Sequence, residues 1–114
     1  MSTRLQAAPA ATSHLAPVQL ERLRRLLVEE HVAQQTRATE LQDPPDLEPD
    51  LAEALLGLCR EALGEIEEAL ALLDRGAYGV CSACGAAIPY ERLEAVPSAR
   101  RCVSCQAGRD RVLR

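Results

Sequence analysis

The chain has 114 residues and a formal net charge of −4, with thirteen basic residues against seventeen acidic ones. This length favours a single domain and argues against an enzyme with two substrate lobes. The acidic balance and the presence of only two aromatic residues argue against a generic nucleic-acid binder, which offers a basic face and stacking rings. All basic residues are arginine, and lysine, asparagine and phenylalanine are missing, which is typical of a GC-rich coding sequence.

The first sixteen residues are rich in alanine but contain no continuous apolar core of the kind that a signal peptide needs. Pro9, Thr12, Ser13 and His14 stand where such a core would lie. No stretch of the chain reaches the roughly eighteen apolar residues of a membrane span. We therefore predict a disordered N-terminal arm over residues 1–16 in a cytoplasmic protein that does not bind a membrane.

An uninterrupted stretch from Pro17 to about Gln42 predicts a first long helix. Proline suits the first helical position, where its missing N–H costs nothing. Leu15 and Leu20 are spaced for a hydrophobic staple across this start. The apolar stripe of this helix is confined to its first half. In the second half the corresponding positions are polar until Leu41, so we expect a weakly apolar seam there. The apolar stripe of the first half consists of Leu20, Leu23 and Leu27.

Residues 43–50 contain three prolines, which forbid a continuous helix, and they are rich in carboxylates. We therefore predict an acidic turn over these residues. From about Leu51 to Arg75 the chain shows the spacing of three heptads, which predicts a second long helix. Gly76 stands where a left-handed C-cap belongs. The predicted seam of this helix consists of Ala52, Leu56, Cys59, Leu63, Ile66, Leu70 and Leu73.

Two long helices joined by a short turn run antiparallel, so residues 17–75 predict a coiled-coil hairpin about 35–40 Å long at 1.5 Å per residue. Folding the chain about Asp46 sets Leu41 near Ala52 and Gln34 opposite Cys59. We interpret Cys59 as a buried, inert side chain. The same folding sets Leu20 near Leu70 and Leu73, and Leu27 near Leu63 and Ile66.

The charges are unevenly distributed along this rod. Residues 1–42 hold five arginines against four acids, residues 43–74 one against ten, and residues 75–114 seven against three. The corresponding net charges are +1, −9 and +4. The sequence therefore predicts a polar rod, negative along its tip and second helix and positive at the other end.

Four of the five cysteines form two C-x-x-C pairs separated by seventeen residues, which is typical of a four-cysteine zinc site. Four thiolates leave no open position for water or substrate, so we predict one structural Zn²⁺ rather than a catalytic ion. A redox dithiol is the competing interpretation, but it would not require the second pair. The predicted ligands are Cys81, Cys84, Cys102 and Cys105.

Arginines lie close in sequence to these thiolates. Arg92, Arg100 and Arg101 either offset the −2 charge of a Zn(Cys)₄ centre or are solvated surface residues. We predict a zinc finger over residues 76–108 and a basic tail over 109–114, which either packs on the rod as a short helix or meets an acidic surface of a partner. The predicted fold is mainly α: an antiparallel coiled-coil hairpin, a small four-cysteine lobe and a short C-terminal helix, in a monomer.

The finger also carries a longer pattern. The run Tyr78-Gly79-Val80-Cys81 leads into Cys84, Ile88, Arg92, Pro97, Cys102 and Cys105 at fixed spacing. This pattern resembles the finger signature of the DksA/TraR zinc-finger transcription regulators. Asp43-Pro44-Pro45-Asp46 resembles the paired aspartates at the tip of that family's coiled coil. The likeness covers residues 17–107.

The resemblance implies a bacterial regulator without enzymatic activity that binds RNA polymerase rather than a specific DNA sequence. Family members insert the coiled coil into the secondary channel, where the tip aspartates alter open-complex stability. Asp43 and Asp46 would then be the effector residues, whereas on sequence grounds alone they could simply cap or turn the chain. Further candidates for polymerase contacts are Arg92, Arg100, Arg101 and Arg109.

The chain departs from the family pattern at several positions. Glu48 replaces an alanine that is frequent two positions after the second tip aspartate. Members that respond to ppGpp have cations at the positions of Val96, Gln106 and Glu65. Neutral or acidic side chains there would weaken a polyphosphate site. We therefore predict little or no ppGpp binding by this chain itself.

Two alternatives remain open from the sequence. The first is a zinc adaptor that binds nucleic acid or another protein through the arginine-rich finger. The second is a thiol-based redox switch that releases zinc on oxidation.

Overall fold

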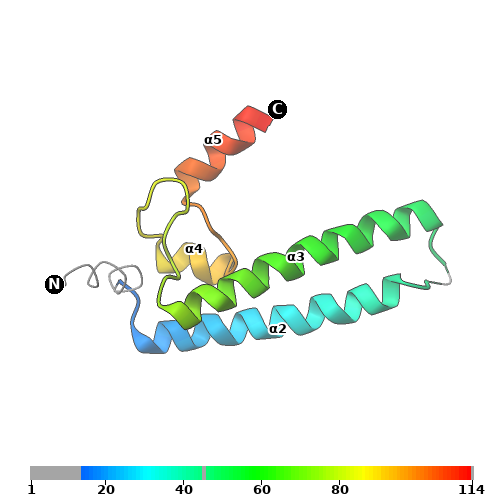
Figure 1. Cartoon of the computed structure of the whole chain (residues 1–114), viewed down its shortest axis with the longest axis horizontal. Helices are drawn as coiled ribbons and strands as arrows, with labels where there is room; N and C mark the ends of the chain where they lie inside the picture. Colours follow the sequence, from blue (N-terminus) through cyan, green and yellow to red (C-terminus); the bar gives the residue numbers. More distant parts are fainter. Residues whose placement is uncertain (1–13, 45, 114) are drawn as a thin grey trace.

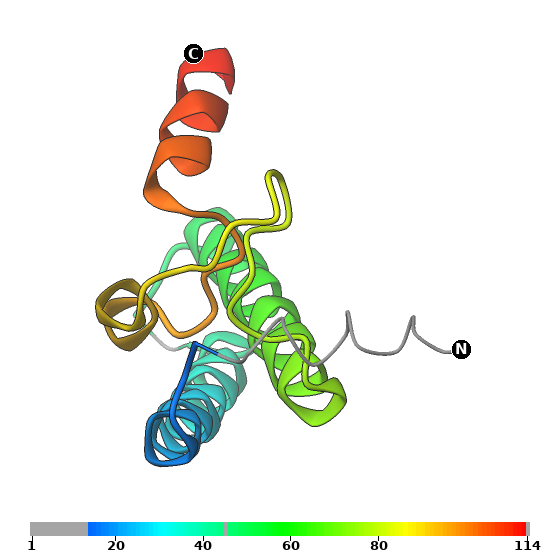
Figure 2. The ribbon, with the colours of Figure 1, turned by 90° about the vertical axis from the view of Figure 1, so that its left-hand side faces the viewer.

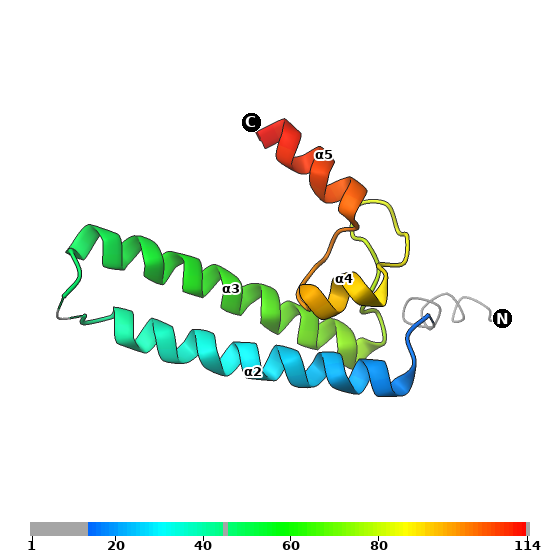
Figure 3. The same ribbon diagram turned by 180° about the vertical axis from the view of Figure 1, so that it is seen from behind.

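The computed structural model describes residues 14–44 and 46–113, and the side chains as far as residue 109. Two long helices run side by side in opposite directions, and a small lobe sits at one end of the pair (Figures 1 and 3). The longest extent is 59 Å. The mainly α fold and the hairpin are therefore confirmed. The helices are α2 (Pro17–Leu41), α3 (Pro49–Arg75), α4 (Tyr90–Ala95) and α5 (Val103–Leu113).

The ends of the long helices follow from local capping. Pro17 is the first residue of α2, as predicted, and the side chain of Gln19 accepts a hydrogen bond from the N–H of Ala16 at 2.8 Å. α3 begins at Pro49, two residues before the expected start, because proline fits the first turn and Glu48 caps it. α3 ends at Arg75, and Gly76 has a φ of +71°, as a left-handed C-cap requires.

The side chains between the helices form two separate clusters. The basal cluster, at the lobe end, holds nine buried residues from both long helices, the lobe and the segment just before α2. The distal cluster, near the turn, holds only Leu41, Leu56 and Cys59. This difference agrees with the polar distal half expected for the first helix. The basal cluster consists of Leu15, Leu23, Leu27, Ile66, Ala69, Tyr78, Cys81, Ile88 and Leu93.

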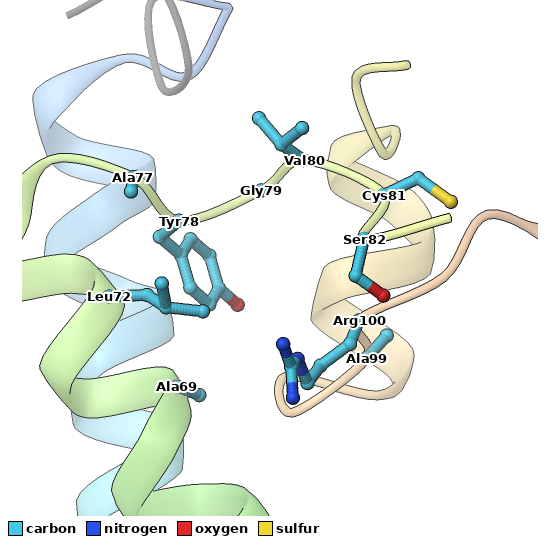
Figure 4. Close-up of a pocket in the computed structure, with 10 residues that line it drawn as sticks. All are labelled: Ala69, Leu72, Ala77, Tyr78, Gly79, Val80, Cys81, Ser82, Ala99 and Arg100. Atoms are coloured by element: carbon cyan, nitrogen blue, oxygen red, sulfur yellow. The ribbon is translucent and has the colours of Figure 1, made fainter. Parts of the chain in front are cut away.

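The seam of α3 follows the predicted heptads at the distal end but shifts near the lobe. Leu70 and Leu73 are only half-buried, whereas Ala69 is 2% exposed. The reason is that Tyr78 and the lobe pack against the Ala69 side of α3, which a two-helix seam does not anticipate (Figure 4). Gln34 and Cys59 line the same small cavity, as the folding about Asp46 predicted.

The lobe is held to the rod by polar contacts as well as by the basal cluster. The buried hydroxyl of Tyr78 donates to the carbonyl of Pro97 at 2.7 Å, and burial raises the pKa of this phenol. The half-exposed ion pairs contribute less, because solvent screens them. Two such pairs join the rod to the lobe, Arg22–Glu94 at 2.9 Å and Arg100–Glu68 at 2.7 Å, and a third, Arg24–Asp74 at 2.8 Å, joins α2 to α3.

The described end of the predicted N-terminal arm is packed rather than disordered. Leu15 is 6% exposed and lies in the basal cluster, and Leu20 packs against that cluster, in agreement with the predicted staple. His14 Nε2 donates to the carbonyl of Ile88 at 2.9 Å. The arm therefore cannot extend to residue 16, because the finger supplies an apolar and hydrogen-bonding surface for residues 14 and 15. Residues 1–13 lie outside the described part of the chain.

The C-terminal helix α5 crosses the expected boundary between finger and tail. It starts at Val103, inside the second cysteine pair, and continues to Leu113, so residues 76–108 and 109–114 are not separate segments. α5 points away from the two long helices (Figures 1 and 2). Within the described residues, the interpretation of the tail as a helix packed on the rod is therefore wrong.

Candidate metal centre and rod tip

The four predicted cysteine ligands meet at one point of the lobe. Their Sγ atoms all lie within 4.8 Å of one another, and Cys84 Sγ is 3.9 Å from Cys102 Sγ. A tetrahedral Zn²⁺ with Zn–S bonds of about 2.3 Å places neighbouring sulfurs about 3.8 Å apart. The residues therefore fit one zinc ion with four thiolate ligands. Cys59, the fifth cysteine, lies in the distal cluster.

The backbone of the first knuckle explains how these sulfurs are presented. Gly79 and Gly85 flank the pair with φ values of +90° and +78°, which favour glycine. The N–H of Gly85 donates to the carbonyl of Cys81 at 2.9 Å, and the N–H of Cys81 donates to the carbonyl of Ala86 at 2.8 Å. These bonds form a tight turn, which presents Cys81 and Cys84 to a common ion.

The electrostatics of the thiol cluster also match a cation site. Backbone N–H groups, that of Cys102 above all, lower the pKa of Cys81 to about 6. The neighbouring thiols, Cys102 first, raise the pKa of Cys105 to about 12. Four thiolates this close repel one another, so full ionisation requires a cation between them.

Two of the arginines near the thiolates make hydrogen bonds and an ion pair that the sequence did not indicate. Arg92 Nε donates to the carbonyl of Arg101 at 3.3 Å, immediately before Cys102. Arg100 pairs with Glu68 of α3, and its carbonyl accepts the N–H of Ser82 at 2.7 Å. Arg92 and Arg100 therefore fix the loop that carries the second cysteine pair.

A cavity of about 550 Å³ lies where the finger meets α3. It brings together the three departures from the ppGpp-responsive pattern, Glu65, Val96 and Gln106. The same cavity collects all four arginines suggested as polymerase contacts, which are separated in the sequence. These arginines are Arg92, Arg100, Arg101 and Arg109.

At the other end of the rod, the turn presents the tip aspartates to solvent. Asp43 and Asp46 are both exposed, and Asp43 lies at the rim of a cavity of about 300 Å³ that Leu47 also lines. Leu47 packs against the distal cluster and anchors the turn. The side chain of Glu48 accepts the N–H of Leu51 at 3.1 Å, so this residue has a structural role that the sequence comparison missed. The position of this acidic residue just before a helix-starting proline could have predicted its role as a cap.

Comparison with known proteins agrees with this geometry. Residues 76–111 match the family model of the prokaryotic dksA/traR C4-type zinc finger. The fold is similar to that of the transcription factor DksA2 from Pseudomonas aeruginosa, with a TM-score of 0.68, 30% identity, and coverage of 83% of this chain and 85% of that one.

Two curated proteins are also similar. General stress protein 16O of Bacillus subtilis is 56% identical over 48 residues, which are 42% of this chain and 29% of that protein. The RNA polymerase-binding transcription factor DksA of Haemophilus influenzae is 35% identical over 77 residues, or 63% and 53% of the two chains. The chain thus spans less than two thirds of either curated relative.

A helical hairpin that ends in a C4-type zinc lobe defines the class of this protein. The chain belongs to the DksA/TraR zinc-finger family, and it carries one structural zinc site. In the described part of the chain, no helix is both long enough and apolar enough to cross a membrane.

Proposed function

We propose that this chain regulates transcription by binding RNA polymerase, with the hairpin tip inserted into the secondary channel. The observation that carries the proposal is an acidic tip held far from the finger on a stiff, narrow rod. The polymerase binding of the H. influenzae relative and the fold of a known transcription factor support the choice of partner. We further propose that the protein acts in the cytoplasm as a monomer, without enzymatic activity or sequence-specific DNA binding.

The dimensions of the rod suit insertion into a narrow passage. α3 has 27 residues and is therefore about 40 Å long at 1.5 Å per residue. Beyond the finger, the rod is only two helices thick, and each helix is about 10–12 Å wide with its side chains. The tip can therefore reach deep into a channel while the finger remains at its entrance.

The chemistry of the tip suits the end of such a channel. Asp43 and Asp46 are exposed carboxylates on a turn anchored by Leu47, so their placement costs the fold little. Carboxylate oxygens are preferred ligands of Mg²⁺ and partners of basic side chains. We propose that they act at the active-site region of the polymerase and thereby change the stability of the open complex.

The chain lacks a ppGpp site of its own in this proposal. Glu65 places a carboxylate in the cavity at the finger–α3 junction, and Val96 and Gln106 bring no charge. Two of the arginines there are engaged, because Arg100 pairs with Glu68 and Arg92 donates to the backbone. Titration of the protein–polymerase complex with ppGpp is expected to show no binding that depends on this cavity. Loss of ppGpp binding on mutation of Arg101 or Arg109 would contradict it.

The deciding experiment is in vitro transcription with RNA polymerase from the same organism. Asp43→Asn/Asp46→Asn removes two charges with little change in shape, so this variant is expected to bind polymerase but not to regulate promoters. Glu29→Gln/Glu91→Gln removes two exposed charges far from the tip and is the matched control, expected to regulate like the wild type. Normal regulation by the tip variant would exclude the proposed mechanism.

A second candidate function rests on the four arginines around one cavity. Such a cluster suits an adaptor that binds nucleic acid or an acidic protein surface. A gel shift with DNA or RNA in the absence of polymerase separates the two functions. A salt-sensitive shift that requires the finger arginines would favour the adaptor.

A further inference from the structure

The first cysteine pair lies on a short loop whose two ends are joined. Val80 and Ala87 form an antiparallel β-bridge, and the N–H of Ile88 donates to the carbonyl of Gly79 at 2.8 Å. Gly79 and Val80 lead directly into Cys81, the first ligand of the pair (Figure 4). We call Gly79 and Ile88 the base of the loop. The position of this base determines where the loop presents its two sulfurs.

Two residues that precede α2 cover the base of the loop. His14 Nε2 donates to the carbonyl of Ile88 at 2.9 Å, across 74 positions of sequence. A Cβ atom at Gly79 would lie 3.1 Å from Cε1 of His14 and 3.2 Å from Cδ1 of Leu15, so both side chains pack directly on the backbone there. Leu15 is 6% exposed and belongs to the basal cluster. His14 and Leu15, here called the latch, therefore hold both ends of the loop.

The second cysteine pair is attached to the rod at a different place. Arg100 pairs with Glu68 of α3 at 2.7 Å, and its carbonyl accepts the N–H of Ser82. The first pair is thus tied to the start of α2 through the latch, and the second pair to α3 through Arg100. Solvent screens the half-exposed ion pair, whereas Leu15 is buried. We therefore expect the latch to be the stronger of the two attachments.

We propose that the latch is a positioning element of the metal centre that determines how firmly the finger retains zinc. Neither of its residues is among the four ligands. Release of zinc requires the two cysteine pairs to separate, because all four sulfurs share one site. The latch opposes this separation because it holds the base of the first loop against the basal cluster.

The proposed coupling acts in both directions. The latch docks on the folded loop, and zinc stabilises the same folded loop, so each favours the other. Removal of zinc is therefore expected to release the latch from the finger as well. This inference goes beyond the proposed function, and it stands whether or not the chain binds polymerase.

The test is the rate at which an excess of a chromogenic chelator removes zinc from the folded protein. Leu15→Ala removes the buried part of the latch, and His14→Ala removes its hydrogen bond and ring contact. Leu56→Ala is the matched control, because Leu56 is also 6% exposed but lies in the distal cluster. His14→Gln is the conservative variant, since its side-chain amide keeps an N–H donor for the carbonyl of Ile88. Circular dichroism melts establish that each variant is folded.

We expect zinc release to be about tenfold faster for Leu15→Ala and about threefold faster for His14→Ala. Leu56→Ala and His14→Gln are expected to stay within about twofold of the wild type, because local opening of the finger does not require the distal cluster to open. Wild-type rates for both latch alanine variants would exclude a role in zinc retention. Equal acceleration by Leu56→Ala and Leu15→Ala would mean that release follows global unfolding, which would overturn the proposal.

The methyl resonances of Leu15 in NMR spectra test the reverse direction of the coupling. Removal of zinc with EDTA is expected to move them to the positions of an unfolded chain, while those of Leu56 stay in place. Unchanged Leu15 resonances in the metal-free protein would contradict the coupling. Should Leu15→Ala fail to fold, the histidine variants decide alone: equal release rates for His14→Ala and His14→Gln would overturn the proposal.

Discussion

The two ends of the rod are built in opposite ways. At the finger end, α2, α3 and the lobe are held together by nine buried residues, two ion pairs between rod and lobe, one between α2 and α3, and a four-cysteine centre. At the tip end, the distal cluster has only three buried residues, and carboxylates and leucines face solvent. The contrast teaches that the groups that stabilise the fold and those proposed to act on a partner are separated along one axis. The tip can present exposed groups with few buried contacts of its own because the other end supplies most of the packing.

The largest expected effect comes from breaking the metal centre. Cys84 is exposed, so Cys84→Ser removes a ligand with little loss of packing. Binding of a structural zinc contributes about 10–16 kcal/mol to the folding of small zinc domains. We expect the finger to lose its ordered structure while the hairpin retains helix. Zinc content and the dispersion of finger resonances in NMR spectra check this, with Cys59→Ala as the control that keeps the metal. A dispersed finger spectrum in Cys84→Ser would contradict the assignment of the site.

The second prediction compares the two apolar clusters directly. Leu23→Ala in the basal cluster is expected to lower the free energy of unfolding by about 3–5 kcal/mol, and Leu56→Ala in the distal cluster by about 2–3 kcal/mol. The difference follows because Leu23 is 0% exposed among nine buried residues, whereas Leu56 is 6% exposed among three. Urea denaturation of the zinc-bound protein measures both. Equal losses would show that the two ends do not differ in packing, and a larger loss for Leu56→Ala would show that the distal cluster is the better packed one.

The third prediction concerns the buried phenol that joins finger and rod. Tyr78→Phe keeps the ring but removes the hydrogen bond to the carbonyl of Pro97, so a loss of about 1–2 kcal/mol is expected. Tyr90→Phe, on a half-exposed ring whose hydroxyl is 3.5 Å from Glu94, is the control and is expected to change stability much less. The same urea experiment measures both variants. An unchanged Tyr78→Phe protein would mean that solvent replaces this bond.

The smallest expected effect lies at the tip. Glu48→Ala removes the side-chain cap on the N–H of Leu51 and is expected to cost about 0.5–1 kcal/mol. Because the cap is local, faster amide hydrogen exchange should be confined to the first turn of α3. Glu48→Gln retains an acceptor oxygen and should show less of the effect. Faster exchange throughout the basal cluster would mean that the two ends are coupled.

Much of this structure was predictable because it depends on residues that are close together in the sequence. An uninterrupted stretch with a short apolar stripe located the first long helix, and heptad spacing located the second. Pro17 and Gly76 marked two of their ends, and the paired cysteines identified the metal site. The contacts that were missed depend on residues distant in the sequence. Leu15 is buried only because the finger returns to the start of α2, and Ala69 only because Tyr78 packs on it.

The candidate site shows the same division. Spacing within each C-x-x-C pair predicted that the sulfurs meet, and the structure brings them within 4.8 Å. Arg92 and Arg109 are seventeen positions apart in the sequence, and only the packing of α4 and α5 around the finger places them at one cavity. The spacing places Leu58 at an outward position of α3. Whether its side chain is buried depends on whether a lobe or a partner covers that side of the helix.

The most direct test of the central claim is photo-crosslinking from the two ends of the rod. A crosslinking amino acid is placed at Asp50, exposed beside the tip, or at Val18, 70% exposed at the finger end, and each protein is bound to RNA polymerase. We predict that the tip position crosslinks to segments around the catalytic Mg²⁺ and that the Val18 position does not. Crosslinks to the active-site region from Val18, or only to the outer surface from Asp50, would contradict insertion of the acidic tip.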